Sequence, residues 1–446
     1  MSQERTIAAI STPQGTGGIS VIRISGDEAV KIADSVFTGR LSDAATHTVH
    51  YGYIKNKSGE RVDEVLVTVM LSPRTFTRED TVEISCHGGS VSTRAVLNAV
   101  VEAGAFPAEP GEFTKRAFMN GRIDLSQAEA VIDIINAKNE LSRRNAVLQL
   151  GGTLSKEIKS VRDELVHLSA EMQVLIDYPD EDLADVAPGD IEAVCRRCED
   201  RIKRLIRSAD SGRIIKDGIK CAIVGKPNVG KSSILNYLAK EERAIVTDVA
   251  GTTRDVIEES VSINGIPLIL SDTAGIHDTE DTVEKIGVEK SKRYIDAADL
   301  VIVVIDSALG IDDEDKAVLR ETENKKHIVL YNKSDISESE ITDGIAVSAV
   351  TGEGMDSLAA EISRLCGLDE IQTENGTVIT NMRHKAALIG ACDALVRAAE
   401  ALSAGMPTDI VSIDISAAMD SLGEITGETV RDSVVNDIFH NFCVGK

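Results

Sequence analysis

Aromatic side chains and basic charge are scarce in this chain. Its 446 residues include no Trp, 6 Tyr and 7 Phe, and 73 Asp plus Glu outnumber 48 Lys plus Arg, which gives a net charge of −25. Few rings are available to stack successive bases, and the charge opposes binding of nucleic acid through phosphate neutralisation alone. The composition therefore argues against a protein that binds nucleic acid through its overall charge or by stacking successive bases on aromatic rings.

A disulfide framework, a secretion signal and a membrane span are also missing from the sequence. The 7 Cys are odd in number and scattered from Cys86 to Cys443. Residues 1–5 carry an acid and no apolar segment, and no run approaches ~18 apolar residues. We therefore expect a cytoplasmic protein that makes no membrane contact.

The chain begins with a β-rich pattern, and a helical pattern then lies before and after a central segment. Residues 1–120 alternate β-rich runs with one helical stretch at 90–103, which predicts an α+β domain with strands at 19–24, 64–71 and 81–86. Apolar residues at helical spacing follow, before and after a central segment, and predict a helical domain that is split in the sequence. The expected helices are 126–150, 154–176, 191–209, 386–404, 410–422 and 428–439.

The central segment, residues 216–376, has buried apolar strands separated by helical stretches. Such a pattern is typical of a parallel sheet covered on both faces. The expected strands are 221–224, 268–271, 300–305, 327–331 and 345–348. We predict a multidomain protein: 1–120 as one domain, 121–215 plus 377–446 as the split helical domain, and 216–376 as an inserted Ras-like α/β domain. The insertion carries −15 of the net charge of −25, whereas residues 1–120 carry only −2.

A phosphate-binding loop follows the first of these strands. Gly225-Lys226-Pro227-Asn228-Val229-Gly230-Lys231-Ser232 has the spacing of a P-loop, and a helix is expected from Ser233. Glycines let backbone N–H groups curl round a phosphate, and the helix N-terminus adds partial positive charge. Lys231 is expected to neutralise β/γ oxygens, and the Ser232 hydroxyl to bind Mg²⁺.

Three more segments complete a guanine-nucleotide site. Asp272-Thr273-Ala274-Gly275 follows a strand, where the acid can hold Mg²⁺ through water and the Gly N–H can meet the γ-phosphate. Asn332-Lys333-Ser334-Asp335 follows another strand, and the Asp335 carboxylate can accept two hydrogen bonds from guanine that adenine does not offer. Ser348-Ala349 suits a backbone contact with the guanine carbonyl.

The residues for hydrolysis are less clear from the pattern. Thr247-Asp248-Val249-Ala250-Gly251-Thr252-Thr253 is the expected switch segment, with Thr253 as the second hydroxyl ligand of Mg²⁺. Ras-like enzymes place a water-orienting Gln after the Asp-x-x-Gly element, but Ile276 stands there. Acids in the following stretch could replace it, and spacing alone selects none of Asp278, Glu280, Asp281 and Glu284.

Motifs outside the nucleotide site carry a resemblance to a known family. They are Pro13-Gln14-Gly15-Thr16-Gly17-Gly18, Phe76-Thr77-Arg78-Glu79-Asp80, His87-Gly88-Gly89, Pro110-Gly111-Glu112-Phe113-Thr114-Lys115-Arg116-Ala117-Phe118, Asp124-Leu125-Ser126-Gln127-Ala128-Glu129-Ala130 and Cys443-Val444-Gly445-Lys446. With them, the chain resembles the MnmE (TrmE) family of bacterial tRNA-modification GTPases from end to end. Glu109 departs from the family pattern, which has Arg there.

The resemblance implies a function and its partners. It implies a folate-binding N-terminal domain, a homodimer formed through that domain, and the FAD protein MnmG as a partner in a heterotetramer or larger complex. Such complexes install a carboxymethylaminomethyl or aminomethyl group at C5 of the wobble uridine in certain tRNAs. The implied cofactor is a tetrahydrofolate derivative, 5-formyl- or methylene-tetrahydrofolate. Methylene-tetrahydrofolate supplies the one-carbon unit.

The resemblance also implies site residues. A K⁺ ion takes the place of an arginine finger, with ligands at Asn228, Thr247, Val249 and Thr252. The water-orienting acid falls on Glu284, and the folate contacts fall on Arg23, Glu83, Arg122 and Lys446. An ion beside the β/γ oxygens would offset charge that develops on the leaving group.

One alternative function stays open at this stage, and one possible metal site is disfavoured. One alternative function is a GTPase switch that acts in ribosome assembly or senses folate, with the folate domain as a scaffold. The pair Cys195 and Cys198 lacks a second pair of ligands, so we expect two cysteines on a helix surface rather than a zinc site.

Overall fold

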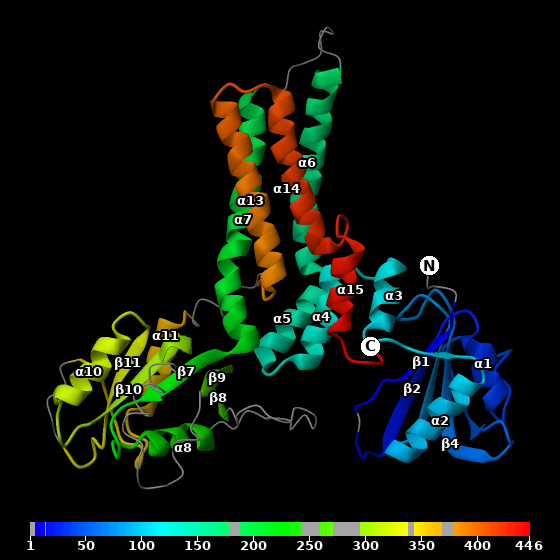
Figure 1. Ribbon diagram of the computed structural model, residues 1–446, viewed down its shortest axis with the longest axis horizontal. Helices are drawn as coiled ribbons and strands as arrows, with labels where there is room; N and C mark the ends of the chain where they lie inside the picture. The colour runs from blue at the N-terminus through cyan, green and yellow to red at the C-terminus, as the bar shows by residue number, and fades with distance from the viewer. Residues whose placement is uncertain are drawn as a thin grey trace. The chain divides into compact units, whose positions relative to one another are not determined.

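A computed structural model describes residues 5–13, 15–177, 188–241, 259–263, 265–270, 295–337, 343–367 and 378–446. The chain divides into two compact units, whose elements are labelled in Figure 1. Unit 1 comprises residues 1–132, 149–166 and 419–446, and unit 2 comprises residues 133–148 and 167–418. Among the described residues, no helix combines the length and hydropathy needed to cross a bilayer.

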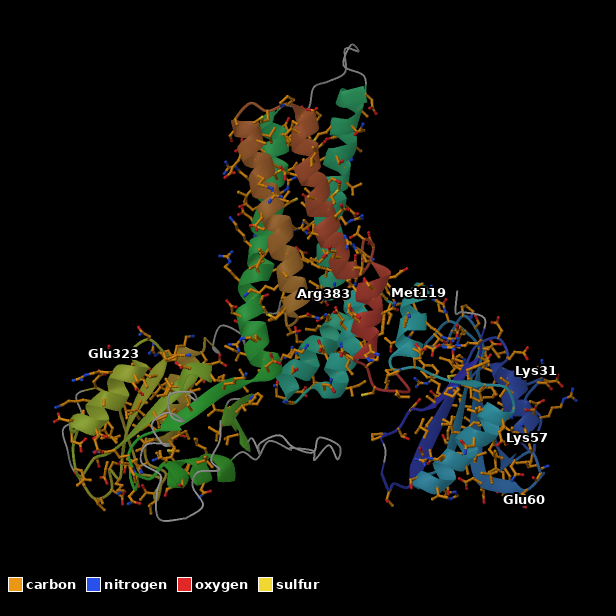
Figure 2. The ribbon with its side chains drawn as sticks, in the orientation of Figure 1. Lys31, Lys57, Glu60, Met119, Glu323 and Arg383 are labelled. Carbon is orange, nitrogen blue, oxygen red and sulfur yellow. The ribbon has the colours of Figure 1, made fainter. Side chains whose placement is uncertain are left out.

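Unit 1 is built on a six-stranded sheet in the order β3-β4-β5-β2-β1-β6. Neighbouring strands are antiparallel except for the β1–β6 pair, and β2 and β5 place Arg23 directly opposite Glu83. The strands are β1 (Ile7–Ile10), β2 (Ile19–Ser25), β3 (Thr48–Lys55), β4 (Arg61–Met70), β5 (Thr81–His87) and β6 (Phe106–Pro107). Lys57 and Glu60 in the turn from β3 to β4 extend into solvent (Figure 2).

The two faces of this sheet differ. One face packs against α1 (Ala29–Val36) and α2 (Ser90–Glu102), and inward residues such as Ile22 and Ile24 are fully buried there. Because side chains alternate along a strand, Val21 and Arg23 lie on the opposite face. On that face Phe113 of α3 (Glu112–Met119) covers β1.

In residues 1–120 the structure adds α1 and α3 to the one helix that the sequence predicted, and in the helical domain it differs most from the expectation at three places. The helix expected at 126–150 is two helices, α4 (Leu125–Asn136) and α5 (Glu140–Leu150). Asn139 causes the break, because its carboxamide oxygen accepts from the Ser142 N–H at 2.7 Å, as an N-cap does, while its Nδ2 donates to the Ile215 carbonyl at 2.8 Å. No local pattern could indicate this second bond, since Ile215 lies 76 residues away.

The helix expected at 191–209 runs further, as α7 (Pro188–Asp217), until Gly218 with φ +83° ends it. Cys195 and Cys198 on α7 are buried rather than on its surface, because α7 packs along α13 (Met382–Ser403). Burial raises the pKa of Cys195 to about 11. Within the described residues, no cluster of His, Cys, Asp or Glu is arranged to hold a metal.

The last helix begins later than expected, at Asp432 in α15 (Asp432–His440). Gly427, with φ +92°, ends α14 (Thr408–Thr426) by donating its N–H to the Gly423 carbonyl, and Glu428 N–H bonds to the same oxygen. The expected helix at 154–176 is confirmed as α6 (Thr153–Asp177).

Unit 2 contains the parallel sheet, in the order β12-β11-β10-β7-β9-β8, with only the β8–β9 pair antiparallel. Its described strands are β7 (Ile219–Val224), β8 (Glu259–Ile263), β9 (Ile266–Leu270), β10 (Leu300–Asp306), β11 (His327–Asn332) and β12 (Ile345–Val347). The described helices between the strands of this sheet domain, or directly after its last strand, are α8 (Lys231–Glu241), α10 (Asp313–Thr322) and α11 (Met355–Leu365).

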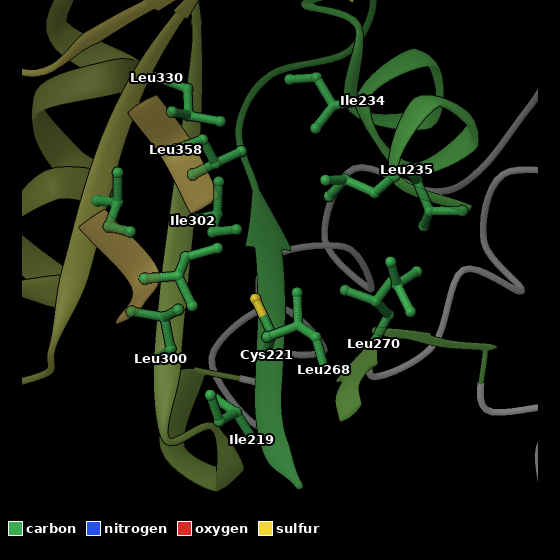
Figure 3. Packing of buried hydrophobic residues seen from close by; sticks show 14 of the residues in the cluster. Ile219, Cys221, Ile234, Leu235, Leu268, Leu270, Leu300, Ile302, Leu330 and Leu358 are labelled. Atoms are coloured by element: carbon green, nitrogen blue, oxygen red, sulfur yellow. The ribbon is translucent and has the colours of Figure 1, made fainter. Parts of the chain in front are cut away.

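Both faces of this sheet are buried, as the apolar strands predicted. Along β10, Leu300 and Ile302 point into one core with Cys221 and Leu268 (Figure 3), whereas Val301 points into a second core on the other face. The central strand β10 has no exposed residue.

The chain enters and leaves this sheet domain at adjacent points. It enters directly from α7, and on its return Val378 and Ile379 lie against α7 and α5. Asn145 donates to the Val378 carbonyl at 3.2 Å, and a Cβ at Gly212 would lie 2.0 Å from the Ile379 oxygen. The sheet domain is therefore held by two neighbouring segments.

Candidate functional site

The nucleotide motifs meet at one edge of the parallel sheet. The loop at 225–230 follows β7, Asp306 ends β10, Asn332 ends β11, and Ser348 follows β12. Since the carboxyl ends of parallel strands lie on one side, loops from four neighbouring strands gather there, where α/β sheets bind their ligands.

Backbone conformation fixes the phosphate-binding loop. Gly225 has φ +146°, and a Cβ there would lie 2.3 Å from the Val304 oxygen. Gly230 has φ +97°, and a Cβ there would lie 2.1 Å from Asn332 Nδ2. Asn228 is exposed with φ +64°, and Val229 beside it is buried. Only glycine suits the first two positions, so the predicted motif has a structural reason.

Lys231 turns back over the loop. Its Nζ donates to the carbonyl oxygens of Gly225 at 2.8 Å and Lys226 at 2.7 Å, and burial lowers the pKa of Lys231. Ser232 and Ser233 follow in the first turn of α8, with Ser232 half-buried. The ammonium and the helix N-terminus thus lie together at the loop, which is an arrangement that suits an anion.

Asn332, at the end of β11, is hydrogen-bonded to this loop. Its Nδ2 donates to the Val229 carbonyl at 2.8 Å, and its Oδ1 accepts from the Ala349 N–H at 3.2 Å. One side chain therefore ties the loop after β7 to the segment after β12. Asp335 is exposed at the same edge.

Lys333 and Ser348 are also held in place. Lys333 has φ +67° and its Nζ lies 2.6 Å from Asp306 Oδ2. Burial would raise the pKa of Asp306, but the bonds from Lys333 and from the Ala308 N–H outweigh it, and the pKa lies below its usual value. Ser348 is fully buried, and its hydroxyl accepts from the Thr351 N–H at 3.2 Å.

Part of the predicted site lies outside the described residues. This applies to the switch segment 247–253, to Asp272-Thr273-Ala274-Gly275 and to Glu284. The described structure therefore brings together the loop 225–233, Asn332-Lys333-Asp335 and Ser348-Ala349.

The four residues that the resemblance assigned to folate gather in unit 1. Arg23 Nε lies 2.8 Å from Glu83 Oε1 across the β2–β5 pair. Burial lowers the pKa of Lys446, and the charge of Arg23 lowers it further against an opposing effect of Glu83. Arg122 lies 4.8 Å from the centre of the Phe76 ring, and Arg23 lies 5.8 Å from the same ring. Two cations thus flank the Phe76 ring, and Glu83 and Lys446 lie beside one of them, Arg23.

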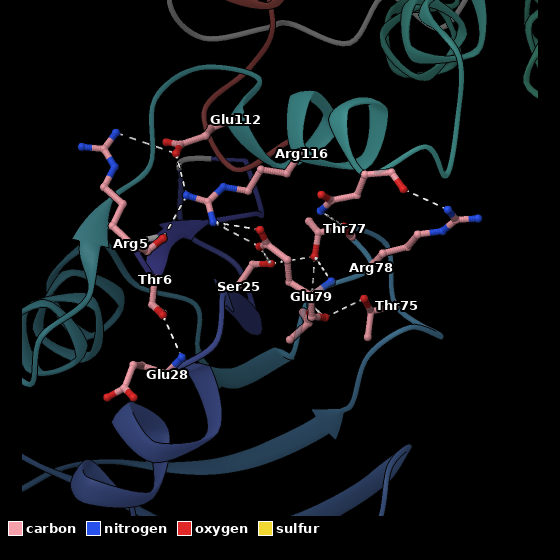
Figure 4. Close-up of polar contacts among 12 residues, drawn as sticks. Arg5, Thr6, Ser25, Glu28, Thr75, Thr77, Arg78, Glu79, Glu112 and Arg116 are labelled. Carbon is pink, nitrogen blue, oxygen red and sulfur yellow. Dashed lines mark hydrogen bonds and ion pairs between the residues drawn. The ribbon is translucent and has the colours of Figure 1, made fainter. Parts of the chain in front are cut away.

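Buried ion pairs join α3 to the sheet of unit 1 (Figure 4). Arg116 on α3 is 4% exposed and donates to Glu79 at 3.1 and 3.2 Å and to Glu112 at 2.9 Å. Ser25 of β2 donates to Glu79 at 2.8 Å. The network fixes α3, and with it Phe113, against the sheet.

Residues 443–446 reach the same cluster. Ser11 Oγ donates to the Gly445 carbonyl at 3.1 Å, and a Cβ at Gly445 would lie 2.2 Å from the Ile10 oxygen. Cys443 is exposed close to Lys446. This contact places Lys446 near Arg23 although 423 positions separate them in the printed sequence.

Sequence reasoning missed three residues at these sites. Phe76 stood in a motif without an assigned role, and its ring position depends on Arg23 and Arg122. Asp306 ends an apolar strand, and its partner Lys333 is 27 residues away. Lys226 stood at a position of the loop motif to which no residue type is assigned. An acid at a strand's carboxyl end was the only available signal, and it pointed to Asp306.

Two protein-family models match this chain. The family described as GTP-binding protein TrmE N-terminus matches residues 6–122, and the MnmE helical domain family matches residues 125–443. A protein of Acetivibrio thermocellus named tRNA modification GTPase MnmE is 48% identical over 459 residues. The match covers 100% of this chain and 100% of that protein. One of the same name from Lactobacillus delbrueckii subsp. bulgaricus is 48% identical, with 99% of this chain and 98% of that protein covered.

Among solved structures, Era of Aquifex aeolicus bound to GDP and aluminium fluoride is 28% identical over 40% of this chain and 66% of that chain, with a TM-score of 0.27. The family assignment depends on the sequence relatives. Two family models together span most of residues 6–443, and relatives are nearly half identical over the whole length. This chain belongs to the MnmE family.

Proposed function

We propose that this chain is a GTPase that acts in tRNA modification, as the names of its relatives state for them. In this proposal it works with MnmG to install the carboxymethylaminomethyl or aminomethyl group at C5 of the wobble uridine. The observation that carries it is the presence of two built sites in one chain: the nucleotide edge of the parallel sheet and the Arg23–Glu83–Lys446 cluster. A nucleotide switch alone needs only the first.

The nucleotide edge suits GTP and Mg²⁺. The curled loop and Lys231 offer N–H groups and charge to phosphates, and the half-buried Ser232 hydroxyl at the start of α8 is an oxygen ligand of the kind Mg²⁺ prefers. Bound Mg²⁺ would neutralise charge on the phosphate oxygens. Asp335 and the Ala349 region select guanine over adenine.

Potassium is proposed as the second ion at this site. Asn228 is the one ligand position of the four within the described residues, and its exposed side chain stands on a left-handed turn beside Val229. K⁺ channels bind the ion through backbone carbonyl oxygens, and the Asn228 carboxamide offers an oxygen of similar chemistry. Glu284 is proposed to orient the attacking water.

The cluster in unit 1 suits a folate. Glu83 can accept from pterin N–H donors, and the cations Arg23, Arg122 and Lys446 can meet carboxylates. The lowered pKa of Lys446 reflects burial first and then repulsion by Arg23, so a bound anion would relieve the crowding of positive charge. Phe76 provides an apolar surface for a flat ring.

A homodimer through unit 1 fits the exposed part of this sheet face, at β3 and β4. Exposed apolar residues lie on the face that holds Arg23 and Glu83, namely Val49 and Tyr51 of β3 and Leu66 of β4. Exposed apolar patches of this kind mark interfaces. A second copy would cover them.

Nucleoside analysis of tRNA tests the proposal. In a strain that lacks this chain, we expect wobble uridines without the C5 substituent, and the modification should return when the gene is restored. Unchanged wobble uridines together with a ribosome-assembly defect would favour the alternative of an assembly switch.

A further inference from the structure

Lys226 in the phosphate-binding loop points away from the loop's own carbonyl groups. Its Nζ lies 2.5 Å from Asp312 Oδ2 and 2.8 Å from Asp315 Oδ2, and its side chain is 16% exposed. Lys231, in contrast, lies on the loop carbonyls. Two lysines of one loop therefore have different partners, and the loop motif accounts only for Lys231.

Both acceptors of Lys226 are fixed at the start of α10. Asp312 is the N-cap, and its Oδ1 accepts from the N–H groups of Glu314 at 3.0 Å and Asp315 at 3.1 Å. The Asp315 side chain is 2% exposed and accepts in return from the Asp312 N–H at 3.2 Å. This reciprocal cap orients both carboxylates before Lys226 reaches them.

The ion pair keeps its charge throughout the neutral pH range. The bond from Lys226, followed by bonds from Asp315, lowers the pKa of Asp312 to about 2, and the two aspartates raise the pKa of Lys226. Lys226 is therefore neutralised by neighbours within the protein. Its contribution to the site lies in geometry rather than in charge offered to phosphate.

We propose that Lys226 is a positioning residue for GTP binding and hydrolysis, which ties the first half of the phosphate-binding loop to the start of α10. The loop holds phosphate through backbone N–H groups, and these act well only when their directions are fixed beforehand. Asn332 anchors the second half through Val229. The proposal rests on the nucleotide function proposed above and adds a residue that its motif does not assign.

The test compares four variants of the full chain by GTP affinity, kcat and thermal unfolding without nucleotide. Lys226→Met removes the anchor, and Lys226→Arg restores a cation that can reach both carboxylates. Asp312→Asn keeps a good N-cap but removes the charge, so the helix start is preserved. Lys316→Met is the control, because it breaks the exposed pair with Asp313 on the same helix.

We expect Lys226→Met to weaken GTP binding about tenfold and Asp312→Asn about threefold, each with lower kcat, as for coupled neighbouring residues. Lys226→Arg should recover most of the loss, and Lys316→Met should match wild type. Affinity and kcat within twofold of wild type in both anchor variants, even with lower thermal stability, would overturn the proposal. If Lys226→Met does not fold, Asp312→Asn decides alone. Wild-type protein that binds no GTP would instead refute the nucleotide function.

Discussion

At the residue scale, Gly230 is the point where the loop after β7 meets Asn332. A Cβ at this position would lie 2.1 Å from Asn332 Nδ2, and φ is +97°. We predict that Gly230→Ala abolishes measurable GTP binding and lowers the unfolding free energy by about 2–4 kcal/mol, from backbone strain and displacement of a buried side chain.

Gly265→Ala is the matched control for this change. Gly265 also has positive φ, +81°, but a Cβ there meets nothing within 4 Å. It should cost only about 1–2 kcal/mol of backbone strain and leave GTP affinity unchanged. Equal affinity of the two variants, measured by titration with a fluorescent GTP analogue, would show that the contact with Asn332 is unimportant.

Asn228 provides a residue-scale test of potassium dependence. Glycine tolerates its φ of +64° and removes the side-chain oxygen, so Asn228→Gly should keep GTP binding. We predict that wild-type turnover falls at least about tenfold when Na⁺ replaces K⁺, as when a charge-stabilising group is removed from a transition state. The variant should be slow in both salts, and equal wild-type rates in K⁺ and Na⁺ would contradict the assignment.

Glu83 provides the corresponding test in unit 1. Glu83→Gln removes the carboxylate that faces Arg23 at 2.8 Å, so the affinity for 5-formyl-tetrahydrofolate should fall about tenfold while GTP affinity is unchanged. Glu64→Gln is the control, because Glu64 is an exposed acid of the same sheet that accepts from Tyr51 at 2.7 Å. Calorimetry that finds the two variants alike would remove Glu83 from the folate site.

At the element scale, an ion pair joins α7 to the sheet that follows it. Arg213 Nη2 lies 2.9 Å from Asp299 Oδ1, and the Lys220 N–H donates to Asp299 Oδ2 at 3.1 Å. Burial would raise the pKa of Asp299, but the bonds from Arg213 and Lys220 outweigh it and the pKa lies below its usual value.

Because the folded-state pKa of Asp299 is lowered, its stabilising effect is present above the unfolded-state pKa and lost as pH falls through the folded value. We predict that wild type is more stable than Asp299→Asn at pH 7 and that the difference shrinks below about pH 4. Urea unfolding between pH 7 and pH 3 measures it, with Asp313→Asn as an exposed control. A difference that is constant with pH would exclude the ion pair as its cause.

The elements also show what local sequence can predict. The five parallel strands of this sheet were expected within one or two residues, because residues such as Val301 and Ile302 are buried on opposite faces and the whole run is apolar. The antiparallel edge strand β8 was not expected. The break between α4 and α5 was not expected, since it depends on Asn139 meeting Ile215. The nucleotide motifs are local and were predicted, whereas Asp306 and Phe76 gain their places through distant partners.

At the scale of the whole molecule, the sheet domain is attached by two adjacent segments. Gly212 on α7 touches Ile379, and Asn145 is bonded to Val378. We predict that replacing residues 218–377 with a short Gly-Ser linker leaves a folded helical chain, because the linker closes a short distance at little entropic cost.

The shortened chain should keep its helical circular dichroism and lose GTP binding. Its unfolding temperature should fall, since Ile215 and Leu141 pack against the sheet's core in the complete chain. The complete chain under the same conditions is the control. Loss of the helical signal in the shortened chain would show that the helices depend on the sheet domain.

The contact between Ser11 and Gly445 has a consequence for biosynthesis. Its two partners are 434 residues apart, so a ribosome that adds about 5–20 residues per second makes the second roughly 20–90 s after the first. During that interval the strands of unit 1 are present while the cluster around Arg23 lacks Lys446. The proposed folate site of a growing chain is therefore completed only by residues that are made after the sheet domain, which ties its maturation to synthesis of that domain.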